Sequence, residues 1–94
     1  MTQISVLFYG PLHDIVGKRK EKVSVQESMT LMDLLEEMKS RYGEKFGRYV
    51  FSNGKLSQSI AFAVDGVSIS KSELIRTKCG EVSEFVILPP ISGG

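Results

Sequence analysis

The chain of 94 residues has no tryptophan, one cysteine and one histidine. A single cysteine, Cys79, excludes an internal disulfide, and one histidine leaves no paired metal-ligand spacing. Long hydrophobic runs are also missing, because no apolar stretch approaches the 18 or so residues of a membrane-spanning helix or has the layout of a signal peptide. We therefore expect one small, soluble cytoplasmic domain without a membrane partner.

An excess of charge of one sign is missing as well. Lys and Arg number 12 against 11 Asp and Glu, which gives a net charge of +1. This balance provides no general attraction to nucleic acid or to an anionic membrane. The basic run Lys18-Arg19-Lys20 fits a solvated hairpin turn, since nucleic-acid binding needs a broader positive face. Nucleic acid is therefore not expected as a partner.

Motifs of an independent enzyme are missing too, including any phosphate-binding loop. His13 follows a Gly-Pro break and fits a surface or partner-contacting residue better than a general base, because no nearby residue orients it. Cys79 lies in a polar stretch where Lys78 alone could lower its pKa, so an incidental thiol is favoured over a reactive one. We expect no catalysis by this chain alone, no bound cofactor and no metal.

Apolar periodicity predicts several short strands and one long helix. The strands are expected at residues 4–9, 21–25, 60–64, 67–69 and 85–88, with one helical turn within 11–17 and a short strand near 49–51. The long helix has Thr30 as its N-cap, Asp33 three residues later, and Gly43 at its end. The stretch 44–59 is expected to be irregular.

This order of elements predicts an α+β fold, a ubiquitin-like β-grasp with a mixed sheet of about five strands and one main helix across one face. The folded body should span residues 1–88, followed by a flexible tail at 89–94. Side chains alternate along a strand, and one helix covers only one face of a sheet. A second set of apolar side chains therefore lies on the face that the helix does not cover: Leu7, Tyr9, Val86 and Leu88. This set forms either an exposed patch or a layer covered by loops, and the pattern leaves both alternatives open.

The most informative segment is the end of the chain, which reads Pro89, Pro90, Ile91, Ser92, Gly93 and Gly94. Proline fixes φ and forbids helix, whereas glycine has no side chain and no φ/ψ preference. Because an apolar strand anchors this segment, a stiff stem with a slim carboxylate tip is favoured over a passive frayed end. From Ile91 to Gly94 the extended tip spans at most about 14 Å, enough to enter another protein's active site.

These residues match a known family. The ending at 88–94, Leu-Pro-Pro-Ile-Ser-Gly-Gly, is similar to the Pro-Pro-Val-Ser-Gly-Gly ending of the small, sulfur-carrying subunit of molybdopterin synthase. Residues 6–17 look like that family's first strand and following turn, and Val64-Asp65-Gly66 looks like its Val-Asn-Gly hairpin. The chain resembles this ubiquitin-like β-grasp family over nearly all of its length.

The resemblance implies that a ubiquitin-activating-like adenylyltransferase uses ATP to convert Gly94 into a transient glycyl-adenylate and then a C-terminal 1-thioglycine. This thiocarboxylate would enter the large subunit of molybdopterin synthase and donate sulfur to a pterin precursor of the molybdenum or tungsten cofactor. The resemblance also places Tyr9, His13 and Leu88 at partner contacts. Leu7 and Val86 are also expected to contact the partner, because they belong to the same set of apolar side chains.

Three other functions fit parts of the chain. A ubiquitin-like protein modifier would be conjugated through Gly94 by the same activation. A sulfur carrier for thiamine thiazole synthesis shares the Gly-Gly end but generally has a shorter body and lacks the Pro-Pro-Ile-Ser stem. A β-grasp binding module would have the Gly-Gly end by accident. Motif context rather than fold decides between them and favours sulfur donation to the pterin.

Overall fold

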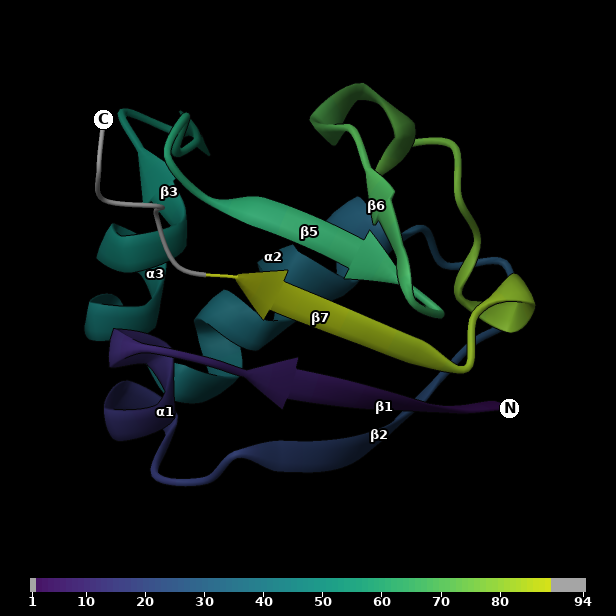
Figure 1. Ribbon diagram of the computed structural model, residues 1–94, viewed down its shortest axis with the longest axis horizontal. Coiled ribbons are helices and arrows are strands. Elements are labelled where there is room, and N and C mark those ends of the chain that lie inside the picture. Colours follow the sequence, from purple (N-terminus) through teal and green to yellow (C-terminus); the bar gives the residue numbers. More distant parts are fainter. Residues whose placement is uncertain (1, 89–94) are drawn as a thin grey trace.

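The computed structural model describes residues 2–88, in which a mixed sheet packs against helices (Figure 1). The sheet has five strands in the order β2-β1-β7-β5-β6. Its strands are β1 (Thr2–Phe8), β2 (Lys20–Val25), β5 (Ala61–Val64), β6 (Val67–Ile69) and β7 (Glu84–Leu88). The central pair, β1 and β7, is parallel, and the other neighbours are antiparallel. The predicted α+β class, the mixed sheet and the positions of its five strands are confirmed.

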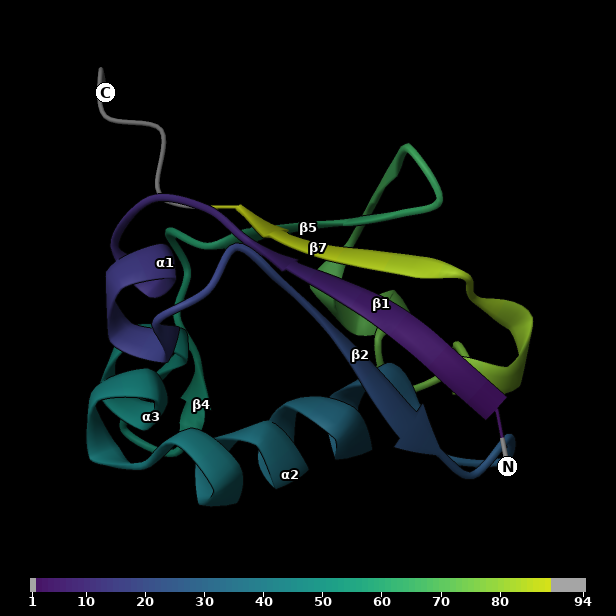
Figure 2. The ribbon, with the colours of Figure 1, turned by 90° about the horizontal axis from the view of Figure 1, so that it is seen from below.

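The α-helices of the described residues all lie on one side of this sheet (Figure 2), and two short 3-10 helices cover Lys71–Glu73 and Cys79–Glu81. The α-helices are α1 (Pro11–Val16), α2 (Leu31–Tyr42) and α3 (Glu44–Val50). The main helix, α2, begins at its predicted cap: Thr30 Oγ1 accepts from the Asp33 N–H, and the Asp33 carboxylate accepts from the Thr30 N–H, both at 3.1 Å. This reciprocal capping box satisfies two donors that the first helical turn leaves unpaired. None of the helices in the described residues is long and apolar enough to cross a membrane.

The prediction that residues 44–59 are irregular is wrong. This stretch contains α3 and a two-stranded hairpin of β3 (Phe51–Ser52) and β4 (Lys55–Leu56). The short strand expected near 49–51 is also misplaced, because Tyr49 and Val50 belong to α3 and the strand begins at Phe51. A helix of seven residues that includes Gly47 has little intrinsic stability, so its local signal is weak. Tertiary packing compensates, because Phe46 and Val50 are fully buried.

The core lies between the sheet and α2. Alternate residues of the two central strands point into it, as the sequence pattern predicts, and all are fully buried: Ile4, Val6, Phe8, Phe85 and Ile87. The facing residues of α2 are Leu31, Leu34, Leu35 and Met38. Full burial of a large apolar side chain stabilises a fold by roughly 1.5–3 kcal/mol, so this layer is the main source of stability.

Asp65 ties the start of β7 to the turn between β5 and β6. Its Oδ1 accepts from the backbone N–H of Glu84 at 2.8 Å and of Ser83 at 3.2 Å. Its own N–H donates to the Glu84 carbonyl at 3.0 Å. With φ at 49°, Asp65 is in the left-handed region, which aspartate and asparagine tolerate better than most residues. The clamp fixes the register from which β7 proceeds to Leu88.

Replacing Asp65 with alanine should lower the free energy of unfolding by about 1–2 kcal/mol, because two hydrogen bonds are lost and alanine is strained at this φ. Asp65→Asn should lose less, since its amide oxygen still accepts and asparagine tolerates the turn. Urea denaturation followed by circular dichroism measures both variants. Equal stability of Asp65→Ala and the wild type would show that the clamp does not contribute.

Candidate functional site

The solvent side of the sheet, opposite the helices, is an apolar strip. We call it the outer face and define it by Leu7, Tyr9, Ala63, Val86 and Leu88. Leu7 and Ala63 flank Val86 in register on the two strands beside β7. Because α1, α2 and α3 lie on the other side, no helix of residues 2–88 covers the outer face (Figure 2).

Exposure varies across the outer face. Tyr9 is 40% exposed, Leu7 and Leu88 are half-buried, and Val86 is only 9% exposed. Val86 is buried although it points away from the core, because it lies in the central strand with Leu7 and Ala63 on either side. Of the two alternatives that the sequence left open, an exposed patch therefore describes Tyr9 but not Val86. The accessible part of the strip is Tyr9 with its half-buried neighbours.

His13 lies close to Tyr9 at the edge of the outer face. Both line a shallow pocket of about 440 Å³, together with Phe8, Gly10 and Arg19. The His13 side chain is half-exposed, and its Nδ1 lies 4.0 Å from the Asp14 carboxylate, which is itself almost fully exposed. A histidine with such a loose and solvated partner is accessible for contact but is not oriented as a general base.

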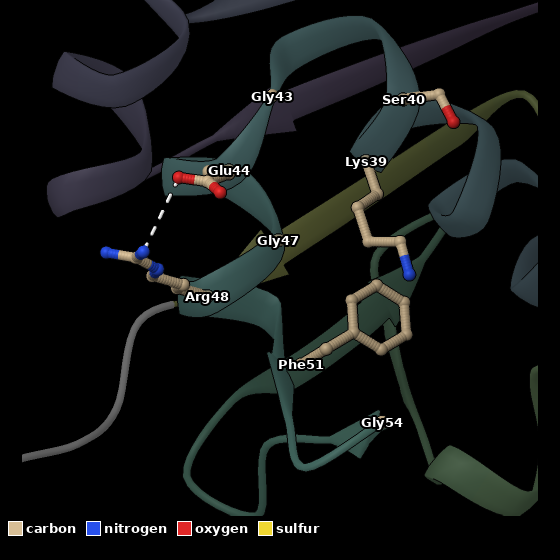
Figure 3. Close-up of a pocket in the computed structure, with 8 residues that line it drawn as sticks. All are labelled: Lys39, Ser40, Gly43, Glu44, Gly47, Arg48, Phe51 and Gly54. Carbon is tan, nitrogen blue, oxygen red and sulfur yellow. Dashed lines mark hydrogen bonds and ion pairs between the residues drawn. The ribbon is translucent and has the colours of Figure 1, made fainter.

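A second pocket, of about 560 Å³, lies on the helix side of the sheet (Figure 3). Its charged side chains have partners: Lys39 Nζ is 3.2 Å from Glu36 and 5.0 Å from the centre of the Phe51 ring, and Arg48 is 3.4 Å from Glu44. Within residues 2–88 no cluster of His, Cys, Asp and Glu could hold a metal ion. This pocket therefore offers a surface but no assembled catalytic group.

Cys79 is fully buried. Burial raises the pKa of its thiol to about 11, and the nearby carboxylates Asp33 and Glu37 add to the rise. The Sγ lies 3.6 Å from the Thr30 carbonyl. A thiol that is protonated and buried is a poor nucleophile, which agrees with the expected incidental cysteine.

The predicted reactive segment lies outside the described residues. It comprises Pro89, Pro90, Ile91, Ser92, Gly93 and Gly94. The structure does place its starting point, because β7 ends at Leu88, which pairs with Ala61 of β5. Since Phe8 pairs with Ile87 in the parallel ladder, Tyr9 and Leu88 follow at the same end of the sheet. Figure 1 shows β1 and β7 both ending on the side where α1, which carries His13, is found.

The fold and this open face define a ubiquitin-like β-grasp protein. The chain matches the ThiS family over residues 6–94. It therefore belongs to the ThiS family of ubiquitin-like sulfur carriers. No curated protein matches the chain.

Solved structures agree with the family match. The small archaeal modifier protein 1 from Methanosarcina acetivorans is 26% identical, with a TM-score of 0.78 over 100% of this chain and 98% of that chain. The putative molybdopterin converting factor, subunit 1, from Pyrococcus furiosus is 23% identical, with a TM-score of 0.72 over 97% and 100%. A chain of the Amycolatopsis orientalis BexX/CysO complex is 20% identical, with a TM-score of 0.70 over 97% and 99%. The family match supports a role as a sulfur carrier or modifier, and the structural likenesses show the shared fold.

Labelling with a thiol reagent tests the buried state of Cys79. The rise of its pKa from an ordinary 9.0 to about 11 lowers the thiolate fraction at about pH 8 about a hundredfold, and burial blocks access further. We expect labelling of the native protein to be at least about a hundredfold slower than in denaturant. Fast stoichiometric labelling of the native protein would contradict the buried placement of Cys79. The Cys79→Ala variant, which has no thiol, is the negative control.

Proposed function

We propose that the chain carries sulfur on Gly94 as a thiocarboxylate and donates it to a pterin precursor in molybdopterin synthesis. The observation that carries this proposal is the position of β7. This central strand ends at Leu88 beside the apolar outer face, so the Pro-Pro-Ile-Ser-Gly-Gly segment begins next to a docking surface. The family match, which extends through Gly94, supports the assignment of that segment.

The chemistry requires an activating partner. A carboxylate is a poor electrophile at neutral pH, so an oxygen of Gly94 first attacks the α-phosphate of ATP held by an adenylyltransferase, and pyrophosphate leaves. Hydrosulfide then attacks the acyl carbon of the mixed anhydride, and AMP leaves with the electron pair of the broken C–O bond. The product is a C-terminal 1-thioglycine, and the chain itself binds no cofactor. Absence of a side chain at Gly93 and Gly94 keeps this end narrow enough for a tunnel.

Two enzymes would use the outer face in turn, the adenylyltransferase and the large subunit of molybdopterin synthase. Exposed tyrosine is typical of interface centres, so Tyr9 is the proposed anchor, with Leu7, Leu88 and His13 around it and Val86 as the floor. The six residues after Leu88 span at most about 20 Å when extended. Docking of the body on the outer face therefore leaves Gly94 within reach of a deep pocket.

A role as a protein modifier is the second candidate. The small archaeal modifier protein 1 from Methanosarcina acetivorans is 26% identical over the whole chain. Both functions begin with the same adenylate and differ in the nucleophile, which is sulfur in one and a lysine amine in the other. Thiazole synthesis is the remaining sulfur-carrier alternative, and it differs in the acceptor of the sulfur.

Intact mass spectrometry tests the activated end. Incubation with ATP, a sulfide source and the cognate adenylyltransferase should add about 16 Da, the difference between sulfur and oxygen. The chain without Gly94 should show no gain and an unchanged circular dichroism spectrum. Loss of the 16 Da on addition of the large subunit and pterin precursor would support the pterin pathway, whereas adducts on lysines would support the modifier. No gain with an enzyme that works on a control carrier would contradict the proposal.

Titration of the large subunit tests the docking surface. Tyr9→Asp should weaken binding at least about tenfold, because it removes an aromatic anchor and places a charge against an apolar partner surface. Val67→Asp is a matched control, since Val67 is 68% exposed on β6, an edge strand of the sheet. Calorimetry measures both affinities. An unchanged affinity of Tyr9→Asp would show that the partner docks elsewhere.

A further inference from the structure

The strand beside the outer face carries a row of cations that sulfur transfer does not explain. In the antiparallel pairing of β1 and β2, Lys20 lies opposite Leu7, and Lys22 lies opposite Ser5. Both lysines are exposed, while Val23 and Val25 point to the core. Because strand side chains alternate, Lys20 and Lys22 lie on the same side of the sheet as Leu7.

The acidic residue of this segment points the other way. Glu21 lies opposite the buried Val6, so it is on the helix side of the sheet. There its carboxylate is 3.4 Å from Lys18 and 3.9 Å from Arg41. Glu21 is therefore neutralised by other cations and leaves the charges of Lys20 and Lys22 unbalanced.

Arg19 immediately precedes β2, near the end of the sheet at which Leu88 lies. Its carbonyl accepts from the Phe8 N–H at 2.8 Å, and it lines the pocket with Tyr9 and His13. We call Lys20 and Lys22 the basic rim. Within residues 2–88 no ion pair involves Arg19 or either lysine of the rim.

We propose that the basic rim binds a row of carboxylates on the protein that docks on the outer face. This proposal rests on the proposed function and names the chemistry of its partner. Neighbouring strands are about 4.8 Å apart, so a protein that covers Leu7 also covers Lys20. Removing an ammonium group from water is costly unless the partner supplies an opposite charge, so the partner surface is apolar at its centre and acidic along one side.

The shape of the charged region favours a protein over a nucleic acid as the partner. The rim is a single row along one strand of a chain whose net charge is +1. Glu84 lies on the same side of the sheet, opposite Ser5, at the end of β7 away from Leu88. A phosphate backbone needs a broad positive surface, whereas a row of carboxylates beside an apolar strip matches this face.

Charges at the rim of an interface act mainly on the association rate, and salt screens them. The test compares the wild type, Lys20→Glu/Lys22→Glu and Lys45→Glu/Lys55→Glu. The last pair lowers the net charge equally, and its two residues lie on α3 and β4, on the helix side of the sheet. Stopped-flow measurements give the association rate constant with the adenylyltransferase and with the large subunit at low and high ionic strength.

The rim variant should associate at least about tenfold more slowly at low ionic strength, and the difference should shrink to about twofold at high salt. The control variant should keep the wild-type rate within about twofold. Equal association rates for all three proteins, or equal slowing of both variants, would contradict the proposal that the basic rim binds carboxylates. Salt-sensitive binding of duplex DNA that only the rim variant loses would also overturn it, in favour of a nucleic-acid site.

The proposed function and the proposed role of the basic rim are tested by different measurements, so one can be contradicted without the other. The function is judged by the 16 Da gain of the wild type, whereas the rim is judged by the rate differences between variants. Association with the large subunit needs no thiocarboxylate, so the rim is tested even if no mass gain occurs.

Discussion

The pairing of β7 with both of its neighbours is the interaction on which the outer face and the proposed chemistry depend. Phe85 and Ile87 are fully buried, and Phe85 stacks on Phe62 of β5 with ring centres 5.6 Å apart. A strand bonded on both edges and anchored by two large side chains cannot shift without breaking the core. Leu88 therefore leaves the sheet from a defined point.

That point matters because, in the proposed function, the chain presents Gly94 to enzymes that supply the catalytic groups. Its parts are a starting point for the Gly-Gly segment, a face for docking, and a charge pattern beside that face. Cys79, the one thiol, is buried with its pKa raised to about 11, so it does not compete for an activated acyl group. In the proposed function, activation and sulfur transfer are carried out by partner enzymes.

The two sides of the sheet differ in what they contact. The helix side holds the core and the satisfied ion pairs of α2 and α3. The outer side exposes an apolar strip to water. Such a strip favours aggregation unless a partner protein covers it. Sulfur carriers and modifiers need this arrangement equally, because both must present one end to an activating enzyme. The acceptor of the acyl or sulfur group then separates the two functions.

The sequence by itself determined the five strands of the sheet, the main helix and its Thr30 cap, because alternation, helical spacing and capping are local signals. It also identified the Gly-Gly ending and the apolar positions of the two central strands. It missed α3, since a short helix that includes Gly47 is held by the burial of Phe46 and Val50 and not by its own propensity.

Tertiary structure alone decided how the candidate face is built. Val86 is buried because strands distant in the sequence lie on both sides of it. Lys20 borders Leu7 through the register of β1 with β2, and Glu21 is turned to Lys18 and Arg41. Lys20, the last residue of a basic run that fits a solvated turn in the sequence, thus borders an apolar surface. Exposure and the direction of a charge depend on neighbours that only folding brings together.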